Sequence, residues 1–390
     1  MNKLNIIIIS LMFGNIFLSL PVSLYSIYKK KESIFTISLF LAILGFYFIP
    51  ETNDYDIARY FLIFEDEICR QEFFTSDGGI ILKYVIKFLI YLKLPKNMLP
   101  FISAFVSYYF LLKVFEKSID KKNVSNLTYF SLFIISYISI PIIGYTGMRF
   151  LPATAIFIFA IIVEKNKYIR LVYMIFSILI HTSILVPVLI FYFCKFFLKK
   201  RIRFNKILIL TSIFLGAFLE PYKLLNLFNE INKFNIIYIS PNYILGKWGM
   251  GFIESRITLI SKLVNYILLY LRFIIIFLFN IFFYNNKNNK NFIKKNFILL
   301  FSCFCFMLYR YFTFWERYTN ILIFIIYFTI ILKNIRSIKY NLFKFMIIIY
   351  FFLNLIYDLR KYYICFYISY NNILKISIID MLIEIIKNYT

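Results

Sequence analysis

The sequence predicts an all-α integral membrane protein, and three observations support that fold class. Of the 390 residues, 62% are hydrophobic and the mean hydropathy is +0.78, yet the formal net charge is +25. Apolar runs such as 4–28 and 265–284 are long enough to cross a bilayer as helices, a conformation that satisfies backbone polar groups within lipid. More than half of the basic residues gather in short segments between such runs, which is typical of cytoplasmic loops.

About twelve segments are apolar enough, and sufficiently free of charge, to be predicted transmembrane helices. They are residues 4–28, 34–49, 98–115, 126–143, 148–163, 169–181, 184–198, 206–219, 264–284, 296–312, 318–332 and 341–357.

The charge of the loops predicts their sidedness. The loops after the odd-numbered segments carry 24 basic and four acidic residues, whereas the rest of the chain holds 20 basic and 15 acidic residues. Because short loops rich in Lys and Arg stay in the cytoplasm, these loops are predicted to lie inside. The N-terminus is then predicted to lie outside.

Residues 80–94 are apolar but carry three lysines. A span here would place every later basic loop outside, so the segment is predicted to be an interfacial helix. It belongs to the first of two large extracytoplasmic loops, 50–97, and the second covers 220–262. The tail 358–390 is also predicted to be interfacial, and the whole chain, 1–390, to form a single polytopic membrane domain.

Nucleotide, dinucleotide and metalloprotease motifs are absent from the sequence. It has no Walker loop, no Gly-rich dinucleotide fingerprint and no H-E-x-x-H, and it contains only 10 glycines. We therefore expect no cofactor and no metal. Because cytoplasmic loops account for the basic excess, we expect no nucleic-acid partner.

Five places bring ionisable residues to the predicted outer ends of spans, where charge is kept mainly for function or pairing. Asp56 and Arg59 are three residues apart, so a helix would place them on one face. Arg149 opens a span, and its planar guanidinium suits phosphate oxygens. His181 is the only histidine and can accept a proton near neutral pH. The remaining candidates are Arg310, Glu316 and Arg317 in a short aromatic turn, and Glu254 with Arg256 in the second loop.

Each place also has a structural interpretation that the residues alone leave open. Asp56 and Arg59 suit a solvated loop, and His181 suits a hydrogen-bonded helix junction. Arg149 and the aromatic turn suit anchors at the headgroups. Taken together, the outward arginines, the histidine and the carboxylates suit an anionic, phosphate-bearing lipid substrate. They suit a transporter less well, because mid-span positions are almost uncharged, with Arg272 the exception.

Several short motifs follow one another in the region 1–357. They are Asp56 to Tyr60 (D-x-x-R-Y), Arg149 before an Ala-containing span, Ile180 to Ser183 (apolar-His-x-Ser), and Arg317-Tyr318 at a late span. In order and spacing they resemble the O-antigen and capsule polysaccharide polymerases (Wzy-type), and within them the EpsG-like family. The R-Y-x-x-G-x-D lead-in of many EpsG-like members is absent, and residues 49–54 stand in its place.

The resemblance implies a glycosyltransferase-like polymerase with a GT-C-like architecture in the bacterial inner (cytoplasmic) membrane. Such proteins join oligosaccharide repeat units carried on undecaprenyl diphosphate, at the outer face of the membrane, into O-antigen, capsule or exopolysaccharide. The implied partners are the lipid-linked oligosaccharide as donor and acceptor, membrane lipid, a chain-length regulator and a flippase.

The same hypothesis assigns roles to individual residues. His181 and Asp56 are the catalytic candidates, which orient or deprotonate the acceptor hydroxyl. Arginines neutralise the charge that develops on the diphosphate, so no metal is needed. Two alternatives stay open: a flippase or transporter of lipid-linked oligosaccharide, and a lipid-to-acceptor glycan ligase. The substrate-binding candidates are Arg59, Tyr60, Arg149, Arg256, Arg310 and Arg317, with Arg149 and Arg317 on the diphosphates.

Overall fold

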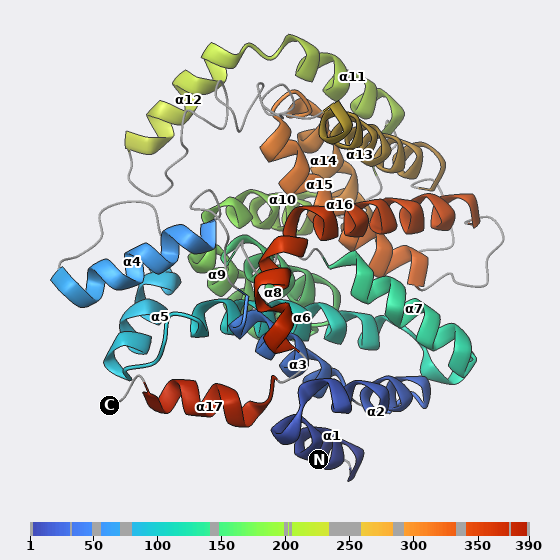
Figure 1. Ribbon diagram of the computed structural model, residues 1–390. Coiled ribbons are helices and arrows are strands. Elements are labelled where there is room, and N and C mark those ends of the chain that lie inside the picture. The colour runs from blue at the N-terminus through green and yellow to red at the C-terminus, as the bar shows by residue number, and fades with distance from the viewer. Residues whose placement is uncertain are drawn as a thin grey trace. The chain divides into compact units, whose positions relative to one another are not determined.

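The regular elements that the computed structural model describes are all helices (Figure 1). The all-helical fold class predicted from the sequence is therefore confirmed for the described part of the chain. The described helices form two compact units, Met1–Thr182 with Asn354–Thr390 and Ser183–Leu353. The described residues are 3–31, 33–48, 56–70, 80–140, 148–198, 202, 205–233, 259–283, 292–332, 341–373 and 376–387.

Length and composition suit a membrane protein. Within the described ranges, three helices are long and apolar enough to cross a membrane: Met98–Ser118, Lys262–Phe282 and Asn341–Leu359. Seven further apolar helices there are shorter, with 10–17 residues. The twelve spans, the sidedness of the loops and the interfacial placement of other segments stay predictions.

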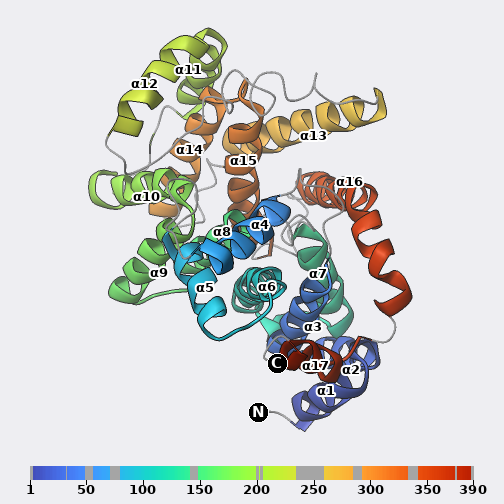
Figure 2. The same ribbon diagram turned by 60° about the vertical axis from the view of Figure 1, so that its left-hand side comes forward.

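The first unit is built around one helix, α6 (Met98–Ser118). Its neighbours are α3 (Ile34–Phe46), α5 (Ile80–Tyr91), α7 (Asn126–Ser139) and α8 (Phe150–Ile162) (Figure 2). The other elements are α1 (Lys3–Gly14), α2 (Ile16–Tyr28), α4 (Asp56–Arg70), the 3-10 turn η1 (Lys121–Asn123), α9 (Lys167–Ile180), α17 (Ile378–Lys387) and the end of α16 (Asn341–Ile373).

Helix α8 is buried on nearly all sides. Residues 151–158 are all buried, and Ala153, Ala155 and Ala160 are 0% exposed. A helix that is apolar all round lies in a core, and small side chains let its neighbours α6 and α9 approach it. This burial holds α8 in place, and Arg149 immediately precedes its first residue.

The predicted segment 4–28 is not one continuous helix. The Asn15 Oδ1 accepts a hydrogen bond from the Phe17 N–H at 2.8 Å, which is an N-cap that starts α2. The Ile16 N–H donates to the Ile376 carbonyl at 3.0 Å, just before α17. The hydropathy of the run gives no sign of this N-cap, so the sequence predicted one continuous segment. At the other end of the chain, α16 runs for 33 residues to Ile373, past the predicted boundary at 357.

Two lysines end helices of the first unit in left-handed backbone. Lys30 has a φ of 57° and Lys93 a φ of 52°, a conformation that costs free energy in any residue with a Cβ. The Lys30 side chain offsets this cost, because its Nζ donates to the Lys121 carbonyl at 2.9 Å and also to the Val124 carbonyl. These bonds tie the end of α2 to η1.

The second unit is built around α14 (Phe292–Met307). Its neighbours are α10 (Leu185–Phe197), α11 (Asn205–Phe218) and α15 (Phe312–Ile326). The other elements are the 3-10 turn η3 (Thr182–Ile184) that leads into α10, α12 (Pro221–Lys233), α13 (Leu259–Leu278), the π-helices η5 (Phe279–Phe283) and η6 (Tyr327–Ile331), and the first part of α16.

Helices α11 and α14 approach closely at Gly216. A Cβ built there would collide with the Phe306 carbonyl oxygen and lie 3.1 Å from the Met307 Cα. The end of α11 is also held by two residues that follow α14. The Arg310 Nη1 donates to the Ala217 carbonyl at 3.0 Å, and the Tyr311 hydroxyl donates to the Leu219 carbonyl at 3.1 Å. Both contacts satisfy carbonyls that a helix C-terminus leaves without intrahelical partners.

We predict that Gly216→Ala lowers the stability of the protein. The added methyl meets backbone rather than a movable side chain, so we expect a loss of about 1–3 kcal/mol, the usual cost of overpacking. Thermal unfolding of the purified protein in detergent would measure it as a lowered Tm. Gly14→Ala is the matched control, because no heavy atom lies within 4 Å of a Cβ there. Equal Tm values for the two variants would contradict the prediction.

Candidate functional site

Tyr60 is the centre of a group of predicted site residues in the first unit. It lies on α4 with Ile57 three residues before it and Phe64 four residues after it, and all three are buried. That spacing places them on one face of the helix. The Tyr60 side chain is only 2% exposed, so its ring has a fixed position.

Two guanidinium groups lie against this ring. The Cζ atoms of Arg59 and Arg149 are each 5.3 Å from the Tyr60 ring centroid, inside the ~6 Å reach of a cation–π contact. The Arg59 Nη2 also donates to the Tyr60 hydroxyl oxygen at 3.3 Å. The electron-rich ring face offsets part of the repulsion between two like charges. The structure thus joins predicted site residues from two distant segments of the chain.

Helix α8 positions Arg149. The residue immediately precedes Phe150, the first residue of α8, and its carbonyl accepts from the Ala153 N–H at 3.1 Å. Its backbone is therefore held by the first turn of a buried helix. The side chain itself is half-buried, and so remains partly accessible to a ligand.

His181 adjoins the same group through Phe150. It ends α9, and its backbone N–H donates to the Ser177 carbonyl at 3.0 Å. The imidazole meets the Phe150 ring edge to face, with 5.4 Å between ring centroids. The start of α8 therefore carries the guanidinium of Arg149 and contacts the imidazole of His181. The arginine–histidine cluster is defined as Arg59, Tyr60, Arg149, Phe150 and His181.

This cluster combines two kinds of chemistry. Guanidinium groups bind phosphate oxygens through two parallel hydrogen bonds, and two guanidiniums near one ring suit a diphosphate. An imidazole can take up or give a proton near neutral pH. Such a set suits a group transfer in which a hydroxyl oxygen attacks a carbon atom and a phosphorylated leaving group departs from that carbon.

The described residues do not bring the remaining predicted site residues into this cluster. Asp56 begins α4, one turn before Tyr60, but its side chain is outside the described residues. Arg256 is outside them altogether. Arg310 and Arg317 belong to the second unit. Arg310 makes the contact with the end of α11 given above, and Arg317 is half-buried on α15.

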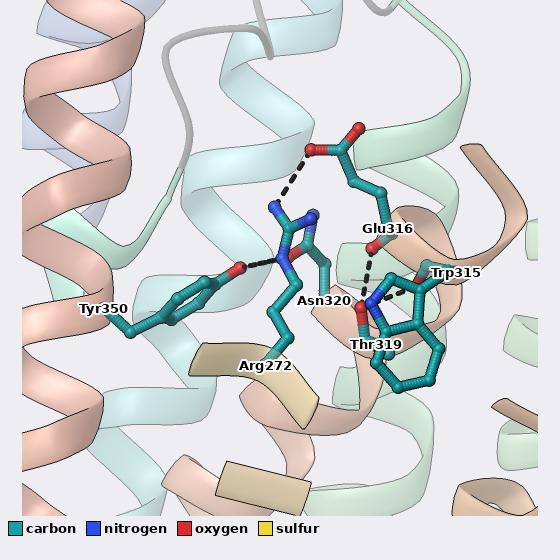
Figure 3. A network of polar contacts seen from close by, with 6 residues as sticks. All are labelled: Arg272, Trp315, Glu316, Thr319, Asn320 and Tyr350. Carbon is teal, nitrogen blue, oxygen red and sulfur yellow. Dashed lines mark hydrogen bonds and ion pairs between the residues drawn. The ribbon is translucent and has the colours of Figure 1, made fainter. Parts of the chain in front are cut away.

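The second unit also contains an ion pair between a buried arginine and a partly exposed glutamate, which the sequence did not predict as a pair (Figure 3). The Arg272 Nη2 lies 2.9 Å from the Glu316 Oε1, and the Arg272 Nε donates to the Tyr350 hydroxyl at 2.9 Å. An arginine inside an apolar run is the signal that marks such a place. Its partner stands 44 residues further along the chain, and no spacing rule connects the two.

Comparisons with known proteins add no relative: no protein-family model, no curated protein and no solved structure matches the chain. The family resemblance therefore stays a prediction made from sequence motifs. In the part of the chain that the structure describes, no group of three or more His, Cys, Asp and Glu side chains is arranged to hold a metal ion.

We predict that Tyr60 and Arg149 are energetically coupled. A double-mutant cycle with Tyr60→Leu and Arg149→Gln should give a coupling free energy of about 0.5–2 kcal/mol, the range for cation–π pairs. The free energies of unfolding of the four proteins in detergent provide the measurement. Tyr84 on α5 is the matched control, since it is 68% exposed and Tyr84→Leu should add independently to Arg149→Gln. Additive effects at Tyr60 as well would show that the ring does not hold the guanidinium.

Proposed function

We propose that this chain is a multi-pass protein of the bacterial inner membrane that polymerises undecaprenyl-diphosphate-linked oligosaccharide repeat units at the outer face. The observation that carries the proposal is the convergence of Arg59 and Arg149 on Tyr60, with His181 against the neighbouring Phe150. Two further arguments support it: the order of the sequence motifs, and the loop charge, which predicts that the start of α8 lies on the outer side.

The proposed reaction is a displacement at the anomeric carbon of the growing chain. The hydroxyl oxygen of the acceptor sugar attacks that carbon and forms the new glycosidic bond. The bond from the carbon to the lipid diphosphate breaks, and undecaprenyl diphosphate leaves with the bonding electron pair. The hydroxyl proton passes to His181 or Asp56.

Arg59 and Arg149 act on the leaving group in this proposal. Negative charge grows on the diphosphate as its bond to the sugar breaks, and fixed positive groups stabilise that charge more than the ground state. Removing one such group lowers the rate on the order of 10²–10³-fold in comparable sites. The roles of Arg256, Arg310 and Arg317 in substrate binding rest on the sequence alone.

A second candidate function, a flippase for lipid-linked oligosaccharide, is favoured by the Arg272–Glu316 pair. Ion pairs at membrane depth mark transport pathways in many transporters, and Arg272 lies at the midpoint of the candidate span Lys262–Phe282. The phenotype of a deletion strain separates the two functions. Loss of a polymerase leaves single repeat units on the cell surface, and loss of a flippase leaves none. A ligase would share the arginine chemistry but differ in its acceptor.

We predict that a deletion strain shows a single-unit band in place of the polysaccharide ladder, and that Arg149→Ala does not restore the ladder. A gel of surface polysaccharide is the measurement, with equal protein levels checked by immunoblot. Arg170→Ala is the matched control. Its Nε donates to the Glu164 carbonyl at 3.0 Å near the end of α8, away from the cluster, so this variant should restore the ladder.

Two results would count against the proposal. An unchanged ladder in the deletion strain would rule out polymerisation, and a full ladder with Arg149→Ala would rule out the role of that arginine. Complete loss of surface glycan in the deletion strain would favour the flippase.

A further inference from the structure

Arg272 is a fully buried cation in the second unit. Its side chain is 1% exposed, and it stands midway along the candidate span Lys262–Phe282. A charge at that depth is costly unless it is paired, and ionisable residues inside spans are usually functional. The guanidinium nitrogens of Arg272 therefore need hydrogen-bond partners inside the protein.

Two of the three nitrogens have partners (Figure 3). The Nε donates to the Tyr350 hydroxyl at 2.9 Å, and that hydroxyl donates in turn to the Asn320 Oδ1. The Nη2 makes a single contact of 2.9 Å with the Glu316 Oε1. The Nη1 is buried and has no hydrogen-bond partner among the described residues. The Nη1 and Nη2 atoms together could hold an anion with two parallel hydrogen bonds, but only Nη2 makes such a bond.

Glu316 is much more exposed than the buried arginine with which it pairs. Its side chain is 35% exposed, against 1% for Arg272. The carboxylate can therefore move toward solvent at small cost, whereas the guanidinium cannot. Replacing Glu316 by an anion that meets both Nη1 and Nη2 would satisfy the buried donor that the ion pair leaves unpaired.

The surroundings favour a negative ligand. Glu316 lies on α15, just beyond the first turn that begins at Phe312. Arg310 and Arg317 stand on either side of Glu316 in the chain, so the positive charge of two further arginines is carried by neighbouring segments. Trp315 on the same turn has a buried Nε1 with no hydrogen-bond partner among the described residues. The buried groups without partners here are hydrogen-bond donors, so a suitable ligand is one that accepts hydrogen bonds.

We propose that Arg272 and the start of α15 form a binding site for a phosphate group, and that Glu316 is a resident carboxylate which the phosphate displaces. The site goes beyond the arginine–histidine cluster, since all its residues belong to the second unit. It does not require that the protein be a polymerase. The phosphate comes either from a lipid headgroup or from a soluble anion.

Fluorescence of Trp315 in a Trp248→Phe background tests the site directly, because the chain has two tryptophans. The protein is purified in dodecyl maltoside, which contains no phosphate, and titrated with pyrophosphate at constant ionic strength. A second titration uses phosphatidic acid mixed into the micelles. A response to pyrophosphate identifies a soluble anion as sufficient, and a response to phosphatidic acid alone identifies a lipid headgroup.

Three variants decide the roles. Glu316→Gln should tighten Kd about tenfold, because it removes the competing charge and a tenfold change corresponds to about 1.4 kcal/mol. Arg272→Met should abolish the response. If that single variant does not fold, Arg272→Met with Glu316→Leu replaces the ion pair by apolar side chains, an exchange that buried pairs often tolerate. Arg170→Met is the control and should bind as the unchanged protein does.

The proposal is overturned by any of three results. The first is that neither the unchanged protein nor Glu316→Gln responds to pyrophosphate or to phosphatidic acid. The second is that Glu316→Gln binds with an affinity equal to or weaker than that of the unchanged protein. The third is that the folded double variant responds normally. The last result would show that the pair only holds α13 and α15 together. None of these results depends on whether the protein polymerises glycan, so the two proposals can fail separately.

Discussion

Cations that are partly or fully buried in an apolar helical protein need partners, and this chain has too few carboxylates to provide them. It carries 44 Lys and Arg against 19 Asp and Glu. The described contacts use two substitutes. Backbone carbonyls at helix ends accept from Lys30 and Arg310, and an aromatic ring lies against Arg149. The chain is rich in such rings, with 33 Tyr and 50 Phe. Aromatic side chains therefore serve as cation–π partners as well as filling the core.

The kind of partner decides what an arginine can still do. A carbonyl partner at a helix end makes the arginine a link between elements, as Arg310 links the start of α15 to the end of α11. A ring contacts a guanidinium through its π face, as the Tyr60 ring contacts Arg149. A carboxylate occupies an N–H group directly, so at Arg272 a ligand has to displace Glu316. The two phosphate sites that we propose, one in each unit, therefore differ in how the arginine is held.

Some features of the fold could be read from local sequence. Long apolar runs predicted helices, and α6, α8 and α13 appear where they were expected. The sequence left open whether Asp56 and Arg59 stand on a helix or in a solvated loop, and in the structure α4 begins at Asp56. The division of 4–28 at Asn15 was missed, because a single capping side chain changes the backbone but hardly changes mean hydropathy. The extent of α16 was missed as well, since a helix continues through charged residues when its backbone bonds are kept.

The sequence by itself determined the helical class, the suitability for a membrane and the residue types available for phosphate chemistry. These depend on hydropathy, helical period and charge, which are properties of neighbouring residues. The tertiary structure decided which of those residues meet. Arg149 reaches Tyr60 across 89 positions, and Arg272 reaches Tyr350 across 78. Such contacts are fixed by how helices pack around α6 and α14, and packing depends on the shapes of many side chains at once, which no local pattern encodes.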